Sequence, residues 1–243
     1  MNNAWQKPDY GIDAPGVVRN LFIAGIAALA LFHFLPSMKL GSVTILFGPM
    51  FRNIAIGCSL GGALMLLYSV FGKFRHGDRM LEMAKLRGDE RVLDVGTGAG
   101  LLLIGAAKKL TTGKATGVDL WSPKDLSGNS PQRTLRNAEL EGVMEKVEVL
   151  DGDASDLKFA DDTFDVVVSN ACLHNIPSRE ARDKACREIA RVLKPGGIAV
   201  IADFIRTHQY QGEFEKAGLK ILPATGLSWK TFPPMRVIKA AKN

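Results

Sequence analysis

The segment that most limits the possible folds of this chain is VLDVGTGAG, residues 92–100, where three glycines occupy alternate positions directly after an apolar run. The apolar run is typical of a buried strand, and residues 101–110 continue with the composition of a helix. Because glycine has no Cβ, the backbone between them turns tightly and approaches a ligand closely. The N–H groups that begin the helix favour a polar ligand. The segment therefore predicts a strand, a ligand-binding turn and a helix.

Strand-like and helix-like segments alternate through the rest of the chain. Ser130-Pro131 and Ser178 are typical helix starts, and KPGG at 194–197 is a typical helix stop. This alternation indicates an α/β protein with a Rossmann-like, doubly wound, mostly parallel seven-stranded sheet. In such a sheet the ligand binds beyond the carboxyl ends of the strands. Strands are expected at 92–95, 115–119, 147–150, 164–169 and 198–203, with two weaker ones at 219–222 and 235–240.

Polar residues follow each of the first four predicted strands, at the edge where a ligand would bind. The second strand ends at Asp119, about 20 residues after the glycine turn, where a carboxylate suits both hydroxyls of a ribose. Asp153 follows the third strand, within reach of an adenine amino group. The fourth strand ends at Asn170 and is followed by Cys172, His174 and Asn175. These positions together predict a site for an adenosine-type ligand.

Two further features narrow the ligand. The glycine spacing is G-x-G-x-G rather than the dinucleotide pattern G-x-G-x-x-G, and the turn holds no Arg or Lys for a pyrophosphate. With RVLKPGG at 191–197, these motifs resemble the class I S-adenosylmethionine-dependent methyltransferases, over roughly residues 78–242. The resemblance is strongest to the small-molecule branch that includes enzymes of ubiquinone and tocopherol biosynthesis.

The resemblance implies S-adenosyl-L-methionine as the cofactor and a role for each matching residue. The three glycines would pass beneath the methionine part, and Asp119 would bind the ribose. Leu120 or Trp121 would cover the adenine, whose edge would meet Asp153 and Ala154, while Asn170 would lie near the amino-acid end. Two alternatives stay open: Asp94 chiefly holds N–H groups of the turn, and Asp153 is a solvated loop acid. The implied cofactor-binding set is Asp94, Gly96, Thr97, Gly98, Gly100, Asp119, Leu120, Asp153, Ala154 and Asn170.

The resemblance also indicates where an acceptor would react. His174, with Asn175 beside it, is the candidate general base or acceptor-positioning residue. Its alternative role is packing or loop capping. The long loop 121–130 and the segment 229–234 are candidate walls of an acceptor pocket, or else ordinary surface connections. Three cysteines without close spacing predict reduced thiols and no metal site.

Two apolar runs precede the α/β part. Between Leu21 and Leu35 only His33 is polar, and between Ile54 and Gly72 no residue is charged. The second run is close to the roughly 20 residues that cross a bilayer. We expect two transmembrane or membrane-embedded helices, at about 18–35 and 53–72, joined by a turn that is partly re-entrant. Buried helices of a soluble protein, or a signal peptide, are the alternatives. The predicted domains are an anchor, residues 1–76, and a catalytic domain, residues 77–243.

Charge predicts the orientation of the anchor. Lys73, Arg75 and Arg79 follow the second run, so the catalytic domain is expected on the cytoplasmic side of the membrane. The net charge of +6 suits contact with anionic membrane lipid. Basic residues are interleaved with acidic ones and form no stripe with aromatics, so no nucleic acid is expected as a partner. A homo-oligomer formed through the apolar helices is compatible with the sequence.

These features predict a membrane-anchored S-adenosylmethionine-dependent methyltransferase of a small, lipophilic acceptor: a quinone, isoprenoid, phospholipid or xenobiotic. Fold alone does not specify the acceptor. One alternative is a methyltransferase of RNA or protein that is only located at the membrane. The other is a non-catalytic membrane protein that binds S-adenosylmethionine.

Overall fold

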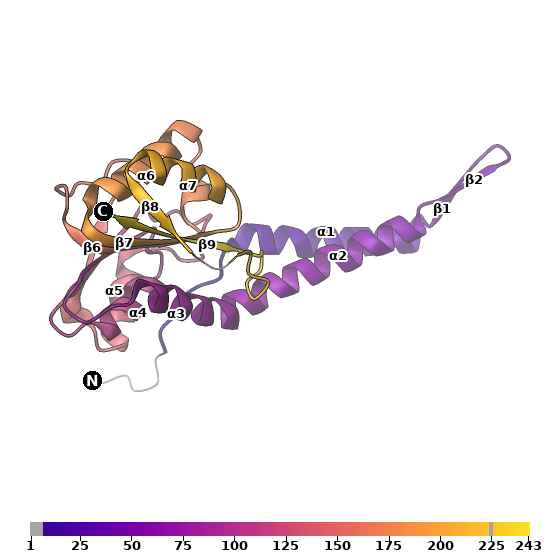
Figure 1. The fold of residues 1–243 in the computed structure, drawn as a ribbon. Helices are drawn as coiled ribbons and strands as arrows, with labels where there is room; N and C mark the ends of the chain where they lie inside the picture. Colours follow the sequence, from indigo (N-terminus) through magenta and orange to yellow (C-terminus); the bar gives the residue numbers. More distant parts are fainter. Residues whose placement is uncertain (1–6, 224–225) are drawn as a thin grey trace.

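The computed structural model describes residues 7–223 and 226–243 and consists of an α/β body from which a long helical hairpin projects (Figure 1). The body is built on a seven-stranded sheet with the order β5-β4-β3-β6-β7-β9-β8 in the part of the chain described. Its strands are β3 (Arg91–Val95), β4 (Lys114–Asp119), β5 (Val147–Asp151), β6 (Phe164–Asn170), β7 (Leu193–Asp203), β8 (Leu219–Leu222) and β9 (Arg236–Lys242).

The first five strands of the sheet are parallel, and β9 runs antiparallel between β7 and β8. The order reverses between β3 and β6, and such a reversal opens a crevice for ligands. All seven predicted strands are present, so the Rossmann-like prediction is confirmed. One boundary differs: β7 begins at Leu193, so KPGG lies within a strand and does not itself end the preceding helix.

Helices cover both faces of the sheet (Figure 1). On one face lie α3 (Lys73–Ala84), α4 (Leu101–Lys109) and α5 (Pro131–Leu140), and on the other α6 (Arg179–Val192) and α7 (Thr207–Lys216). The predicted caps are confirmed, since Oγ of Ser130 and of Ser178 accepts an N–H from the first turn of α5 and of α6. Two short 3₁₀ helices, η2 (Met144–Lys146) and η3 (Leu173–Asn175), complete the body.

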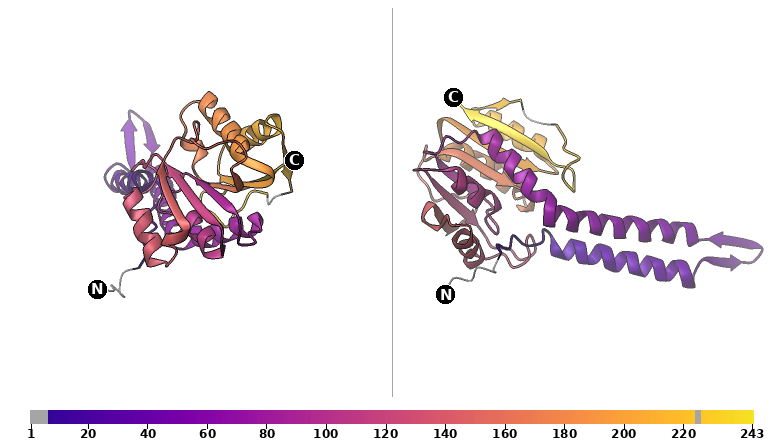
Figure 2. Two further views of the ribbon diagram at one scale, coloured as in Figure 1. Left: turned by 90° about the vertical axis from the view of Figure 1, so that its left-hand side faces the viewer. Right: turned by 90° about the horizontal axis from the view of Figure 1, so that it is seen from below.

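The projecting part consists of two antiparallel helices, α1 (Pro15–Phe34) and α2 (Gly48–Leu67), and a terminal β-hairpin (Figure 2). The β-hairpin pairs β1 (Ser37–Leu40) with β2 (Val43–Leu46), at the place where the sequence predicts a partly re-entrant turn. The α2 helix starts five residues before the predicted boundary. It continues through the π-helical turn η1 (Tyr68–Gly72) into α3.

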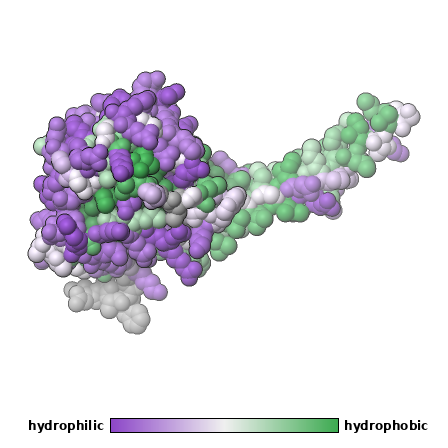
Figure 3. All heavy atoms as spheres, viewed as in Figure 1, coloured by the Kyte–Doolittle hydropathy of each residue, from purple (hydrophilic) through white to green (hydrophobic). Residues whose placement is uncertain are grey.

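Both projecting helices are long and apolar enough to cross a membrane, and most of their residues are exposed. Figure 3 shows this apolar surface along the hairpin, in contrast to the mostly hydrophilic body. The two helices approach each other at small residues. A Cβ at Gly25 would lie 2.6 Å from Oγ of Ser59, and one at Gly62 would lie 3.0 Å from the ring of Phe22. The hairpin therefore packs closely inside and leaves its outer faces apolar.

Residues 7–14, here called the N-terminal strap, join the two parts of the molecule. The buried Lys73 ammonium donates to the carbonyls of Tyr10 and Gly11, each at 2.7 Å, and lies 3.4 Å from the Asp13 carboxylate. Ser69 also exchanges hydrogen bonds with Asp13. The end of the second apolar helix is thus hydrogen-bonded to the segment that precedes the first.

Candidate cofactor and acceptor site

The glycine turn lies at the carboxyl end of β3, next to the reversal of the sheet order. Gly96, Gly98 and Gly100 have φ values of 76°, 55° and 87°, a region that favours glycine. Space also requires glycine at the first position, because a Cβ on Gly96 would lie 2.3 Å from Sγ of Cys172. The turn therefore requires glycine both for its backbone conformation and for its close packing.

Asp94 lies beneath this turn and is 2% exposed. Its Oδ2 accepts the Thr97 hydroxyl at 2.8 Å and the Leu103 N–H at 3.0 Å. Burial raises the pKa of Asp94 to about 7, against the effect of these two hydrogen bonds, which favour the carboxylate. Asp94 and Thr97 thus hold the turn in place. For Asp94 this is the alternative that the sequence left open beside cofactor binding.

Asp119, at the end of β4, faces the glycine turn. Its Oδ2 accepts the Gly98 N–H at 2.7 Å, and its Oδ1 accepts the Trp121 N–H at 2.6 Å and the Asn129 amide at 3.2 Å. A carboxylate oxygen has two lone pairs, so Oδ2 keeps one for a ligand hydroxyl. A second hydroxyl would replace the Asn129 amide, the longest of these bonds. This position and donor set suit a ribose.

The residues predicted around the adenine lie at the neighbouring strand ends. Leu120 is 68% exposed after β4, and the indole N–H of Trp121 donates to the Asp151 carboxylate at 2.5 Å. Asp153 is exposed, and its Oδ1 accepts the Ser155 N–H at 2.8 Å, while Ala154 is buried in the core. Asp153 therefore both closes its own loop and keeps Oδ2 available at the rim.

Asn170 and Cys172 follow β6, the strand beside the glycine turn. The Oδ1 of Asn170 is buried and has no hydrogen-bond partner in residues 7–223 and 226–243. Burial raises the pKa of the Cys172 thiol, so it is neutral, and it packs against Gly96. The unpartnered amide oxygen is a position that a ligand donor would satisfy.

His174 is paired with a residue that the sequence prediction missed. Its Nδ1 lies 2.9 Å from Oδ1 of Asp203 at the end of β7, outside linear hydrogen-bond geometry, and its ring packs edge-on against Phe204. Asp203 is 1% exposed, and its Oδ2 also accepts the backbone N–H of His174 at 3.0 Å. Asn175 is exposed and does not join this pair. Asp203 could have been identified as a site residue from the sequence, because it stands at the end of a predicted parallel strand.

The loop 121–130 and the N-terminal strap lie together over the glycine turn. Ile12 and Ser127 exchange two hydrogen bonds, and the Ala14 N–H donates to the Asp125 carbonyl at 2.8 Å. Leu126 lies between them, within contact distance of both Gly11 and Gly98. The loop is therefore held in place as a cover rather than left as a free surface connection.

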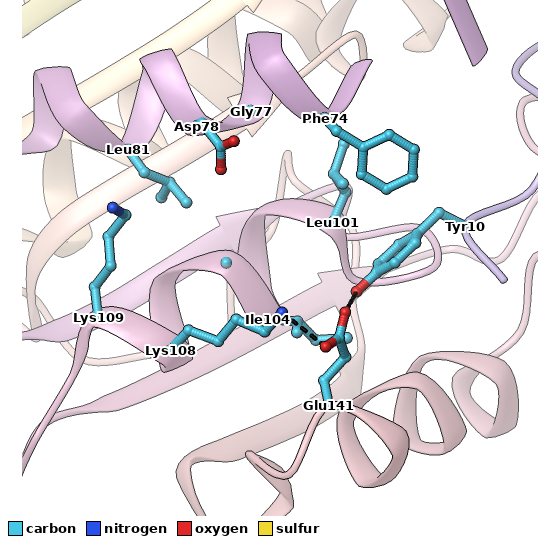
Figure 4. A pocket seen from close by; sticks show the side chains of 11 residues that line it. Tyr10, Phe74, Gly77, Asp78, Leu81, Leu101, Ile104, Lys108, Lys109 and Glu141 are labelled. Atoms are coloured by element: carbon cyan, nitrogen blue, oxygen red, sulfur yellow. Dashed lines mark hydrogen bonds and ion pairs between the residues drawn. The ribbon is translucent and has the colours of Figure 1, made fainter. Parts of the chain in front are cut away.

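Two other features lie apart from the strand ends. A cavity of about 320 Å³ opens between α3, α4 and the end of α5, where Lys108 and Tyr10 both contact the Glu141 carboxylate (Figure 4). The segment 229–234 follows β8, and its Trp229 is 81% exposed, so this side chain does not wall a pocket as predicted. Among the described residues no group of His, Cys, Asp and Glu is arranged to hold a metal ion.

The site fits S-adenosylmethionine on three observations. The glycine turn has the positive φ values of a tight ligand-binding turn, the Asp119 carboxylate suits a ribose, and the buried Asn170 Oδ1 is an acceptor that an ammonium group would suit. All three lie at the carboxyl ends of β3, β4 and β6, where this class of sheet binds ligands.

Comparison with known proteins defines the class. Residues 93–201 match the family model described as a methyltransferase domain. Residues 93–201 are thus a methyltransferase domain, with S-adenosyl-L-methionine as its cofactor.

Particular relatives agree with this assignment. The chain is 32% identical over 127 residues to the ubiquinone/menaquinone biosynthesis C-methyltransferase UbiE of Ruegeria sp., covering 52% of this chain and 47% of that protein. It is 31% identical over 141 residues to the sterol 24-C-methyltransferase erg6 of Aspergillus fumigatus, and this match covers 57% of this chain and 34% of that protein. The match spans half or less of both relatives. A crystal structure of a SAM-dependent methyltransferase from Aquifex aeolicus shares the fold, with a TM-score of 0.54 and 21% identity. The match covers 68% of this chain and 88% of that chain.

Proposed function

We propose that this chain is a membrane-anchored methyltransferase that transfers the methyl group of S-adenosylmethionine to a small, lipophilic acceptor in the bilayer. The observation that carries the proposal is the continuity of one helical run from Gly48 to Ala84. Its first part is apolar and exposed, and its last part packs on the methyltransferase sheet. An acceptor that partitions into lipid would then meet the site at the membrane surface.

The relatives support a lipophilic acceptor. The names of two of them refer to ubiquinone or menaquinone biosynthesis and to a sterol, which are compounds of low polarity. Neither name fixes the acceptor of this chain. The shared chemistry is methyl transfer to a compound that partitions into the bilayer.

Methyl transfer depends mainly on how the protein positions the cofactor and the acceptor. The cofactor, when bound, supplies a methyl group on a positively charged sulfur, which is already activated for in-line displacement. Holding the two reactants in line at about 3 to 3.5 Å contributes most of the rate. His174 would accept the acceptor proton where one must leave, a contribution of about 10²–10⁴-fold. The carboxylate of Asp203, 2.9 Å away, would stabilise the imidazolium that results.

The proposed orientation places the body on the cytoplasmic side. Lys73, Arg75 and Arg79 stand directly after the apolar run, and basic residues near the ends of membrane helices stay on that side. The antiparallel helices also return the N-terminal strap to the side of the body (Figure 2). Protease protection in sealed inverted vesicles tests this: cleavage of the body without detergent is expected.

The acceptor class is tested with the full chain in vesicles prepared from a membrane lipid extract, with S-adenosylmethionine carrying a tritiated methyl group. Label in the organic phase is the expected result. The Asp119→Ala variant, which loses the ribose partner, serves as the negative control. Label confined to added RNA or to protein would replace the lipophilic acceptor with a macromolecular one. Binding of cofactor without label in any phase would indicate a non-catalytic binding protein.

A further inference from the structure

The segment that connects β8 to β9 lies at the edge of the sheet where the candidate site is built. β8 and β7 run in the same direction, because both are antiparallel to β9. β9 begins at Arg236, opposite Asp203 at the end of β7. Residues 226–235, here called the β8–β9 segment, therefore stand at the carboxyl edge of the sheet, on the same side as the His174 and Asp203 pair.

The β8–β9 segment also contacts the helix that leads into the helical hairpin. The Tyr68 hydroxyl of η1 lies 3.9 Å from Sδ of Met235, and both side chains are buried. The Ser228 N–H donates to the Met235 carbonyl at 2.7 Å, and the buried Thr231 hydroxyl accepts the Met235 N–H at 2.7 Å. Figures 1 and 2 show the connection between β8 and β9 beside the base of the helical hairpin, near the place where α2 meets α3. The segment is thus a hydrogen-bonded turn at that junction.

Large apolar side chains are exposed on this turn and on the helix beside it. Trp229 is 81% exposed and Leu227 is 45% exposed. Val70 and Phe71, in the helical turn that also holds Tyr68, are 50% and 67% exposed. Apolar exposure therefore continues from the helical hairpin onto the body, at the one edge of the sheet where the hairpin leaves it.

The composition of the segment suits the surface of an anionic membrane. Residues 226–236, GLSWKTFPPMR, contain Lys230 and Arg236 and no Asp or Glu. Tryptophan is enriched where a membrane meets water, because its ring is apolar and its N–H is polar. Lys230, exposed beside Trp229, adds attraction to anionic headgroups. A lipid surface also accounts for the position of the segment at the base of an apolar hairpin, which a soluble partner does not.

We propose that the β8–β9 segment is a second membrane contact, which places Trp229 and Leu227 at the boundary between the headgroups and the acyl chains of the leaflet that the body faces. This inference rests on the membrane location of the helical hairpin proposed above. Two contacts fix the orientation of the body, whereas a hairpin alone would let it rotate. The carboxyl edge of the sheet then faces the lipid, and an acceptor reaches His174 from the leaflet.

The test measures the contact of Trp229 with lipid in the full chain, reconstituted in vesicles of phosphatidylcholine and phosphatidylglycerol. Part of the phosphatidylcholine carries bromine, which quenches nearby tryptophan, either near the headgroup or near the end of its acyl chains. The signal of Trp229 is the difference between the wild-type protein and Trp229→Phe, in which the other tryptophans cancel. We expect bromine near the headgroup to lower this signal at least about twofold, and more than bromine at the chain ends, as for a tryptophan at the interface.

Two reporters in the Trp229→Phe background make the result specific. Ile26→Trp reports on the helical hairpin and should be quenched most by bromine at the chain ends, since position 26 is near the middle of α1. Met144→Trp replaces an exposed residue that precedes β5, at the opposite edge of the sheet, and should not be quenched. Quenching of Ile26→Trp without quenching of Trp229 would overturn the second contact and leave the anchor in place. Absence of quenching at both positions would overturn the anchor as well.

Discussion

The hairpin and the body use apolar residues in opposite ways. In the body the side chains of Ile104, Ile189 and Ile238 are at most 1% exposed, between the sheet and its helices. In the hairpin Ile23 and Ile26 are 56% and 70% exposed, on helices that pack only along one side. The same residue type is hidden from solvent by protein in one region and presented outward in the other.

This contrast is the basis of the proposed membrane anchor. Exposed apolar surface of this extent on a helix pair costs free energy in water and none in hydrocarbon. Helices that are apolar all round are typical of membrane segments, whereas those of the body are amphipathic or buried. The end of α2, the Lys73 contacts and the N-terminal strap form the place where the two regions meet.

The largest expected difference between the regions is in side-chain truncation. Ile189→Ala, in the core beneath α6, should lower the free energy of unfolding by about 2–5 kcal/mol. Ile26→Ala should change it by less than about 0.5 kcal/mol, because the side chain makes few protein contacts. Chemical unfolding of both variants in mild detergent measures this. Similar losses would mean that Ile26 is buried against protein, for instance in an oligomer.

A charge placed on the hairpin sharpens the comparison. Ile26→Arg should disfavour membrane insertion by about 2.5–3.5 kcal/mol, near the middle of α1. The matched control is Met144→Arg, since Met144 is an exposed apolar residue of the body at 43%. The fraction of each protein that stays with membranes after alkaline extraction is the measurement. Equal retention of both variants would contradict a membrane location for α1.

The Lys73→Met variant tests the contacts that hold the N-terminal strap where the hairpin meets the body. This change leaves the carbonyls of Tyr10 and Gly11 without their donor and Asp13 without its cation, at a cost of about 1–3 kcal/mol. We expect faster hydrogen exchange in residues 7–14 and in the loop 121–130, which the strap holds. Lys109→Met, which removes an exposed cation of α4, is the control and should leave exchange unchanged.

The last comparison concerns the pH dependence of stability, through Asp94 within the body. Its pKa of about 7 lies above the value of about 3.9 for an unfolded chain, so the folded state binds the proton more tightly. The contribution of Asp94 to stability is therefore fully present below about pH 4 and is lost as the pH rises to about 7. Asp94→Asn retains an acceptor for Thr97 and Leu103 and should remove this pH dependence.

Unfolding free energies of both proteins at pH 5 and pH 8 measure the Asp94 effect. At pH 5 the substitution should change stability by less than about 1 kcal/mol, because both accepted hydrogen bonds remain. At pH 8 the variant should be the more stable protein. A wild-type protein that gains stability over the variant between these pH values would show that Asp94 is ionised at little cost.

Local patterns in the sequence were enough to predict the sheet and its glycine turn. Most of the seven strands contain a short apolar stretch with turn residues beside it, and the turn at 96–100 follows from glycine spacing alone. The same holds for the helix caps at Ser130 and Ser178. These features depend on neighbours within a few residues.

Contacts between distant parts of the chain were not predictable. The bond between Asp9 and Asn137 joins residues 128 positions apart, and Asp203 meets His174 only because β6 and β7 are neighbours. The continuity of α2 with α3 was also missed, since a glycine at 72 and the charged residues after it resemble a helix end. Tertiary packing of α3 on the sheet overrides that local signal.

The most direct test of the account compares the full chain with one in which residues 19–67 are replaced by a short Gly/Ser linker, keeping the strap and α3. Both are given S-adenosylmethionine with a labelled methyl group and vesicles of a membrane lipid extract. We expect the two proteins to bind S-adenosylhomocysteine with equal affinity. Organic-phase label should appear at least about tenfold more slowly without the hairpin, because anchoring raises the effective acceptor concentration. Equal rates of labelling by the two proteins would contradict the role of the hairpin in delivering the acceptor.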